Sequence, residues 1–568
     1  MSNFDLVIRG GTVVDGSGGA PFRADVGITG GCISAIGAEL PDGAETIDAT
    51  GLLVTPGFVD VHTHYDGHVT WENRLIPSSC HGVTTAIIGN CGVGFAPCKP
   101  EGREGLIRLM EGVEDIPFPV LATGLPWTWE SFPEYLAFLA GRSFDMDVAA
   151  YVPHAALRVY VMGARGVERE LATAEDIARM SALLAEAMDA GAIGIATSRT
   201  IFHRSSDGKS IPTLDAGEAE LLAFADVLRD KGRGVFQIVE DIHLPEGSLA
   251  LIRKLAERSG RPVTFSIGTG NTGPYKWPAL LDDMADANAN GLVIKGQLMP
   301  RGIGMMLGPE LTLNPFYSTP GYAALASLPL AERLEELRKP AVRAEILSQA
   351  LDPNAASVLG QMVRGFDTMF ELGSPPDYEQ PPENSISARA ARMGISPEEL
   401  AYDLMVEGER GGRLYLAMAN YADGSLDAVG EMLKHPDVVP GLGDGGAHCG
   451  TICDGSYSTF LLAYWGRDRT HGRLSLPDIV RRLSAETAEL MGLDDRGTLA
   501  PGKRADINLI DFDGLKLHAP EVTYDLPCNE KRLVQRAEGY RATLVNGEVV
   551  YRDGAAAGPL PGRLIKAA

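Results

Sequence analysis

Short apolar stretches alternate along this chain with segments of helical periodicity. Apolar residues recur at helical spacing in 174–190, 214–231 and 249–259, and a capping-box pattern at Thr173 and Asp176 begins the first of these helices. Eight apolar runs predict strands, at residues 58–62, 83–88, 148–152, 193–197, 234–239, 263–266, 292–297 and 438–441. Strands that alternate with helices form parallel βαβ units, so eight of them predict a (β/α)₈ barrel.

The two ends of the chain have a different pattern. Residues 1–55 predict short strands joined by glycine turns, and similar strands recur near 505–510 and 541–550, the last with a turn at Asn546-Gly547. Neither set of strands can bury both of its faces alone. We therefore predict that residues 1–55 and 500–568 fold together as one small β-domain beside a barrel of residues 56–499.

Two segments interrupt the alternation. Residues 92–146 are rich in Pro, Trp and Phe, and residues 302–437 contain several helices, including 328–338 and 397–406. Connections of this length are often a lid or the wall of a pocket. We treat 302–437 as an insertion in the barrel.

Composition and charge narrow the range of partners. The 568 residues carry a formal net charge of -25, whereas nucleic acids and anionic membranes require a basic surface. No apolar run is long enough to span a bilayer, and the first residues lack a basic region followed by an apolar core. Seven scattered cysteines fit a reducing cytoplasm, with each thiol buried or acting as a ligand. We expect a cytoplasmic protein with a small-molecule substrate.

A His-x-His pair follows the first predicted barrel strand. Side chains alternate along a strand, so His62 and His64 point the same way. Neutral imidazoles are common ligands of divalent metals. The spacing fits one metal ion, although two histidines near a strand end also occur without a metal.

Two further residues could join such a site. Cys91 follows the second strand between glycines, where a thiolate could bind a metal, although a cysteine in a turn is often a buried small side chain. Asp444 follows the eighth strand, where a carboxylate could bind a metal and accept a proton from water, although glycine-flanked turn aspartates are also common.

Other polar residues follow the third and fourth strands. His154 and His203 could bind a substrate or polarise its carbonyl, and Arg158, Arg199 and Arg204 could pair with a substrate carboxylate. Each of them could equally be structural. Together they follow successive strands, at the end of a barrel where active sites lie.

The chain resembles the amidohydrolase superfamily and, within it, the N-acyl-D-amino-acid deacylases, or D-aminoacylases. The resemblance keeps its order over nearly the whole chain. The matching segments are residues 56–64, 82–85, 89–92, 112–117, 190–194, the glycine cluster around Asp444, 496–506 and 545–547.

This resemblance implies a distorted (β/α)₈ TIM barrel with a small β-sandwich made from both termini. It also implies zinc, a metal-activated water and hydrolysis of an amide-type bond. His62, His64 and Asp444 would be metal ligands, and Asp444 would also be the base. Cys91 would be the bridging or additional ligand that D-aminoacylases use where other members have a carboxylated lysine. A homo-oligomer is a further expectation from the family.

The sequence departs from the D-aminoacylases at two strand ends. Where these enzymes present metal-binding histidines after the fifth and sixth strands, this chain has Gln237 and Ser266. Amide and hydroxyl oxygens are poor zinc ligands beside imidazole. We therefore expect one zinc ion rather than two, with His203 or His243 as a possible replacement ligand.

The sequence thus favours a metal-dependent hydrolase of an N-acyl amino acid or a related amide. Asp444 would be the general base, and His154 and His203 would stabilise the oxyanion. Two alternatives stay open. The substrate could be a cyclic amide, carbamate or ester, or the barrel could bind a small amide without turning it over.

Overall fold

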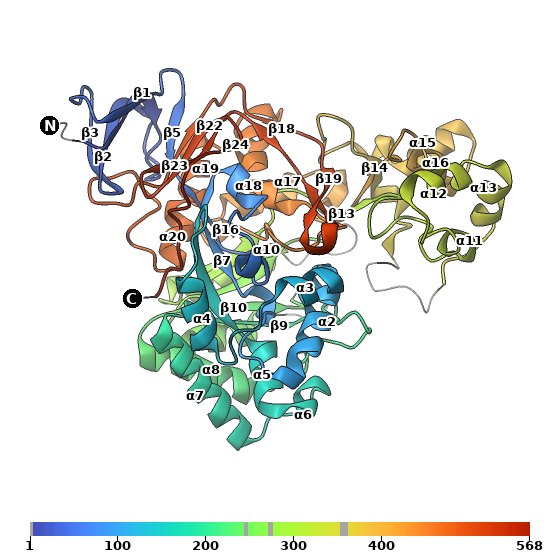
Figure 1. The fold of residues 1–568 in the computed structure, drawn as a ribbon, viewed down its shortest axis with the longest axis horizontal. Coiled ribbons are helices and arrows are strands. Elements are labelled where there is room, and N and C mark those ends of the chain that lie inside the picture. The colour runs from blue at the N-terminus through green and yellow to red at the C-terminus, as the bar shows by residue number, and fades with distance from the viewer. Residues whose placement is uncertain (1–3, 243–247, 271–276, 353–359, 361, 568) are drawn as a thin grey trace.

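A parallel sheet of eight strands forms the centre of the computed structural model, which describes residues 4–242, 248–270, 277–352, 360 and 362–567 (Figure 1). The strand order is β16-β12-β11-β10-β9-β8-β7-β6. The bounds are β6 Phe58–Asp60, β7 Val83–Ile88, β8 Asp147–Pro153, β9 Gly194–Arg199, β10 Val235–Glu240, β11 Val263–Ile267, β12 Ile294–Leu298 and β16 Val438–Pro440. All eight predicted strands are present, and the prediction of a distorted barrel is confirmed.

The residues that follow β6 and β16 bring the two edge strands together. Thr63 and Gly445 form a parallel bridge, His64 N donates to Gly445 O at 2.8 Å, and Asp444 N donates to His62 O at 3.1 Å. Strand β6 ends two residues earlier than predicted because the Asp60 carboxylate accepts the His62 N–H at 3.1 Å. The barrel therefore closes at the segment that contains both histidines.

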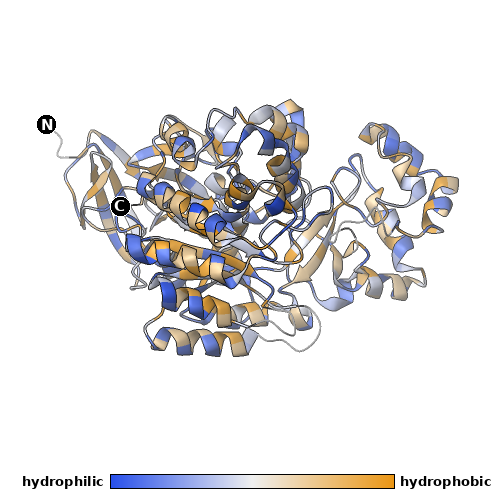
Figure 2. Cartoon of the chain, turned by 90° about the horizontal axis from the view of Figure 1, so that it is seen from below, coloured by the Kyte–Doolittle hydropathy of each residue, from blue (hydrophilic) through white to orange (hydrophobic). Residues whose placement is uncertain are grey.

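Helices cover the outside of the sheet. They include α5 His154–Met162, α7 Ala174–Ala190, α8 Glu218–Lys231, α9 Ala250–Ser259, α10 Trp277–Ala289, α19 Leu476–Leu483 and α20 Ala485–Leu490. The predicted capping box at Thr173 and Asp176 is present. Helix α8 starts later than its apolar pattern suggested, because Gly217 is its N-cap. Figure 2 shows hydrophobic residues along the strands and both hydrophobic and hydrophilic residues on the surrounding helices.

Both termini contribute to one nine-stranded sheet. Its members are β1 Leu6–Val13, β2 Phe22–Thr29, β3 Cys32–Gly37, β4 Glu45–Asp48, β5 Leu53–Pro56, β17 Ile507–Ile510, β22 Tyr540–Val545, β23 Glu548–Arg552 and β24 Ala555–Ala556. Antiparallel pairing of β5 with β17 joins the two ends of the chain directly. The turn at Asn546-Gly547 lies between β22 and β23, as predicted. The exact domain boundaries stay predictions.

The insertion forms a lobe with its own small sheet and cores (Figure 1). Its strands are β13 Ile303–Leu307, β14 Met369–Glu371 and β15 Leu414–Ala419, and its helices include α11 Pro320–Ala323, α12 Leu330–Leu337, α13 Pro340–Leu347, α15 Ile386–Met393 and α16 Pro397–Met405. Helix α17 Asp427–Lys434, at the end of the predicted insertion, packs instead on the barrel strands β12 and β16. A hairpin of β19 Glu521–Leu526 and β20 Glu530–Val534 contacts the lobe, since Arg410 and Arg413 donate to the carbonyl oxygens of Val522 and Pro520.

The segment rich in Pro, Trp and Phe contains three helices, α2 Arg103–Glu114, α3 Phe118–Gly124 and α4 Phe132–Ala140. Helix α2 ends at Glu114 because Asp115 takes a left-handed conformation, with φ of 49°. Since Glu114 is buried, the end of α2 lies inside the protein, where it contributes to the site described below.

All seven cysteines are free. Cys32 and Cys528 are exposed, so the expectation that every thiol is buried or a ligand is wrong for these two surface positions. In the part of the chain that the structure describes, no helix is both long enough and apolar enough to cross a membrane.

A buried ion-pair network joins the C-terminal segment to the barrel. Arg496 Nη1 lies 2.7 Å from Asp147 Oδ2 and 3.5 Å from Asp506 Oδ2, and Arg504 Nη2 lies 3.0 Å from Asp147 Oδ2. The side chains of Arg496 and Asp147 are only 4% and 1% exposed. Each carboxylate therefore depends on the arginines for its charge balance.

We predict that Arg496→Met lowers the free energy of unfolding by about 3 to 5 kcal/mol, because it leaves a buried carboxylate without its main partner. Denaturant unfolding followed by circular dichroism measures the change. The control is Arg481→Met, which breaks a pair with Glu486 at a side chain that is 31% exposed, and which should cost about 1 kcal/mol or less. Equal losses in the two variants would contradict the prediction.

Candidate metal centre

His62 and His64 lie on the segment that closes the barrel. Thr63, between them, pairs with Ile87 on one side and with Gly445 on the other, so the two imidazoles project to the same side of the chain. Both side chains are 1% exposed, and their ring centroids are 5.4 Å apart. The geometry expected from the His-x-His spacing is therefore present.

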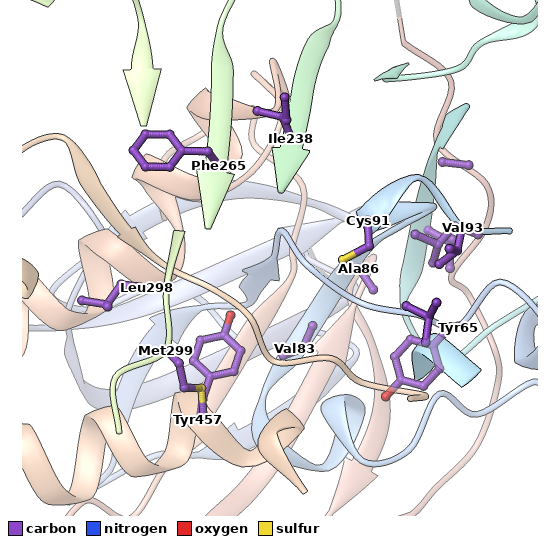
Figure 3. Packing of buried hydrophobic residues seen from close by; sticks show 14 of the residues in the cluster. Tyr65, Val83, Ala86, Cys91, Val93, Ile238, Phe265, Leu298, Met299 and Tyr457 are labelled. Carbon is purple, nitrogen blue, oxygen red and sulfur yellow. The ribbon is translucent and has the colours of Figure 1, made fainter. Parts of the chain in front are cut away.

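A tight turn after β7 brings Cys91 to these histidines. Gly89, Cys91 and Gly92 all have positive φ, of 83°, 56° and 69°. A Cβ at Gly89 would lie 2.5 Å from the carbonyl oxygen of Tyr151, so the turn requires a glycine there. The Cys91 Sγ lies 3.3 Å from His62 Nε2. Figure 3 shows Cys91 among the buried hydrophobic side chains, together with Ala86 and Tyr65.

Asp444 completes the group from the other side of the closure. Its Oδ1 lies 3.4 Å from His62 Nε2 and 3.6 Å from His64 Nε2. The backbone here is strained, since Leu442, Asp444 and His448 have φ of 57°, 44° and 53°. Positive φ at three residues that are not glycine is the kind of strain that clusters at functional sites.

His62, His64 and Cys91 form a group that could hold a zinc ion, and Asp444 Oδ1 lies beside its two histidines. Two ligands about 2.1 Å from one tetrahedral zinc ion are roughly 3.4 Å apart, and the measured separations within this group are 3.3, 3.4 and 3.6 Å. The ligand atoms of His62, His64 and Cys91 all lie within 4.8 Å of one another. Asp444 Oδ1 is buried without a hydrogen-bond partner. A cation would offset the cost of burying this oxygen.

Two glutamines form hydrogen bonds to His62 and Cys91 and support their positions. Gln297 Oε1, on β12, accepts a hydrogen bond from His62 Nδ1 at 2.6 Å, with the ring proton assigned to this nitrogen. Gln237 Oε1, on β10, accepts from the backbone N–H of Cys91 at 3.0 Å. Ser266, on β11, lies in register with Gln297. The Gln237 side chain therefore supports Cys91, and Gln297 is a supporting residue that the sequence did not reveal.

Glu114 and His448 also belong to the group, and sequence reasoning missed both. Glu114 Oε2 lies 3.5 Å from His64 Nε2 and 3.6 Å from His448 Nε2. Burial raises the pKa of Glu114 well above its usual value, and the carboxylates of Asp444 and Asp66 add to this. The signal that could have found them was present, because both residues lie in segments that match the D-aminoacylases.

His203 lies near this group. Its Nδ1 is 2.8 Å from Ser198 Oγ, at the end of β9. Burial, followed by the nearby His448 and His62, lowers the pKa of His203 to about 3, so its ring is neutral at physiological pH. The structure therefore places His203 near His62, His64 and His448, and the role expected for it stays a prediction.

His154 and Arg158 belong to a different buried cluster. The two ring nitrogens of His154 lie 2.7 Å from Thr197 Oγ1 and 2.7 Å from Glu220 Oε1. Arg158 pairs with the same Glu220. Since protein atoms already take both ring nitrogens, the structure gives a structural explanation for this pair, and the roles in catalysis and substrate binding expected for it stay predictions.

The other two arginines have protein partners, Arg199 on the neighbouring strand β10 and Arg204 within its own loop. Arg199 Nη1 lies 3.7 Å from Glu240 Oε2. Arg204 Nε donates to Ile201 O at 3.2 Å, and its Nη1 donates to Gly208 O at 3.2 Å. His243, the other candidate replacement ligand, lies outside the described residues.

Comparisons with known proteins give the family. A family model described as the amidohydrolase family matches residues 45–551. The D-aminoacylase of Alcaligenes xylosoxydans xylosoxydans is 26% identical over 574 residues, which is 99% of this chain and 97% of that protein. A solved structure of D-aminoacylase, whose binuclear centre shows one-metal activation and second-metal attenuation, has a TM-score of 0.65 at 24% identity and covers 99% of this chain and 100% of its own.

A second solved structure is similar over the same length. The N-acyl-D-glutamate deacylase of Bordetella bronchiseptica, complexed with zinc and a phosphonate that mimics the tetrahedral intermediate, has a TM-score of 0.64 at 24% identity. It covers 99% of this chain and 100% of its own. At this identity the two structures show a shared fold. With the family match over most of its length, the chain belongs to the amidohydrolase family, is D-aminoacylase-like within it, and is a hydrolase.

Proposed function

We propose that the protein hydrolyses the amide bond of an N-acyl amino acid with a single zinc ion held by His62, His64, Cys91 and Asp444. The observation that carries this proposal is the spacing of their donor atoms, at 3.3, 3.4 and 3.6 Å. Full-length relatives named D-aminoacylase, N-acyl-D-aspartate deacylase and N-acyl-D-glutamate deacylase support the substrate class.

The proposal of one zinc ion rests on the side chains at the ends of the fifth and sixth barrel strands, Gln237 and Ser266. Gln237 uses its amide oxygen to hold the Cys91 backbone, and Ser266 offers only a hydroxyl. Neither competes with imidazole or thiolate for zinc. The one-metal activation of the structurally similar D-aminoacylase supports a working centre with one ion.

Different side chains of the site would serve different steps of the hydrolysis. A bound zinc ion would lower the pKa of a water molecule and polarise the scissile carbonyl. Asp444 accepts the proton when the water oxygen forms its bond to the carbonyl carbon, and it returns that proton to the nitrogen when the C–N bond breaks. His203 hydrogen-bonds the carbonyl oxygen. Arg199, the last residue of β9, or Arg204, on the loop that follows it, pairs with a substrate carboxylate.

Removal of zinc should abolish hydrolysis. We expect dialysis against a chelator to bring the turnover of N-acyl-D-amino acids to background, and one equivalent of zinc to restore it, because the ion supplies the nucleophile. Ninhydrin detection of the released amino acid, beside elemental analysis, measures both quantities. Full activity in metal-free protein would refute the proposal. A substrate panel with L-enantiomers and cyclic imides tests the substrate class, since ring opening releases no second product.

Asp444→Asn should separate metal binding from proton transfer. The amide keeps an oxygen near the two histidines but cannot accept the proton, so we expect kcat to fall by about 10³-fold, within the usual range for a general base. Zinc content, measured on the same samples, should stay above half of the wild-type value. Asp189→Asn is the control, since that carboxylate is 63% exposed and pairs with Lys231. Activity of Asp444→Asn equal to that of the control would exclude Asp444 as the base.

Gln297→Leu should weaken zinc binding. It removes the acceptor that orients His62 through Nδ1, and the loss of such a partner typically lowers metal affinity by about 10- to 100-fold. Competition with a fluorescent zinc chelator measures the affinity. Gln349→Leu, in the insertion lobe, is the matched control. Unchanged affinity in Gln297→Leu would show that His62 needs no support from β12.

A further inference from the structure

The metal group is open to solvent on one side only. The side chains of His62, His64 and Glu114 are 1%, 1% and 2% exposed, and Cys91 is buried. In contrast, the Asp444 side chain is 22% exposed and the His448 side chain is 13% exposed. A substrate that approaches the group therefore meets Asp444 and His448 first.

The backbone around His448 is fixed by the end of helix α2. His448 N donates to the Glu114 carbonyl oxygen, and Cys449 N donates to Asp115 O at 3.2 Å. The Asp115 carboxylate accepts from Gly450 N at 3.1 Å and from Thr451 Oγ1 at 2.9 Å. These contacts hold His448 at a positive φ of 53°, a conformation that persists only where the surroundings enforce it.

The two ring nitrogens of His448 have different surroundings. Nε2 lies 3.6 Å from Glu114 Oε2, whereas Nδ1 is buried without a hydrogen-bond partner among the described residues. Two core histidines of this protein, by contrast, have partners for both ring nitrogens. The partners of His81 lie at 2.8 Å and those of His154 at 2.7 Å. His448 thus keeps one polar atom unused beside the metal group.

We propose that His448 is a further catalytic residue, which carries its ring proton on Nδ1 and donates a hydrogen bond from there to the carbonyl oxygen of the scissile amide, and that Glu114 is the positioning residue, whose protonated carboxyl group faces Nε2 and keeps the ring proton on Nδ1. This inference rests on the proposed function, because the carbonyl oxygen is that of the amide substrate. The partner of one ring nitrogen decides which nitrogen of an imidazole faces the reaction. The hydrogen bond strengthens as the oxygen gains negative charge in the tetrahedral state.

The test is a kinetic cycle on the zinc-loaded enzyme with an N-acyl-D-amino acid. Removal of one oxyanion donor typically costs about 100-fold in kcat, so we expect that loss in His448→Ala, with KM changed less than about threefold and zinc content unchanged. His448→Asn, which places an amide near the Nδ1 position, should recover part of kcat. Glu114→Gln should lower kcat by about 10-fold.

The double variant tests the division of roles. If Glu114 acts through His448, Glu114→Gln in the His448→Ala background should cause no further loss. Additive losses would show that Glu114 acts through His64 instead, and would overturn its assigned role. His471→Ala, at a side chain that is 62% exposed, is the control for the loss of an imidazole.

Three results would overturn the role of His448. The first is an unchanged kcat in His448→Ala. The second is a loss of zinc in proportion to the loss of activity, which would make His448 a ligand. The third is activity in His448→Asn no higher than in His448→Ala.

The same measurements distinguish failure of the proposed function from failure of the role of His448. If wild-type enzyme with zinc hydrolyses no N-acyl amino acid, the proposed function fails. If wild type and His448→Ala hydrolyse it equally fast, only the role of His448 fails.

Discussion

The closure of the barrel between the residues after β6 and those after β16 is the constraint on which the site depends. Two backbone hydrogen bonds, from Asp444 N to His62 O and from His64 N to Gly445 O, bring the ends of these edge strands together. Because side chains alternate along the closing segment, the same bonds that complete the barrel bring Asp444 to both histidines. Loss of this pairing would open the sheet and separate the candidate ligands in one step.

Several ionisable side chains are buried together at this closure, and charging them there is costly. His62, His64, Cys91 and Glu114 are packed with little access to water, Asp444 is partly exposed, and burial raises the pKa values of the thiol and of both carboxyls. With no cation, the acidic groups favour their protonated forms, because an unpaired buried charge is costly. A bound metal ion would reverse that preference for the groups that ligate it. Metal binding and deprotonation of these acidic groups would therefore be thermodynamically linked. The supporting side chains of Gln237 and Gln297 carry no charge, so they do not change the net charge of the site.

Much of the fold could be predicted from local patterns, since each barrel strand is a short apolar run and each outer helix has an apolar stripe. His62 and His64 could be found from their spacing, whereas Cys91 and Asp444 needed the family resemblance. Local sequence could not distinguish His154 from His203, because both follow a barrel strand. The difference lies in Glu220, which is far along the chain and takes one ring nitrogen of His154.

The pairing of Glu114 with His448 could not be read from the sequence for a related reason. It depends on the end of helix α2 docking against the loop after β16, and neither segment carries a periodic pattern that specifies its partner. Asp115 makes this docking possible, since one carboxylate oxygen accepts from both Gly450 N and Thr451 Oγ1. The loop that supplies Asp444 is strained at several residues, and a strained loop stays in place only where other contacts over-determine it. The segment that lies between the second and third barrel strands thus fixes the loop that follows the eighth, and this links a region outside the regular barrel to the geometry of the candidate site.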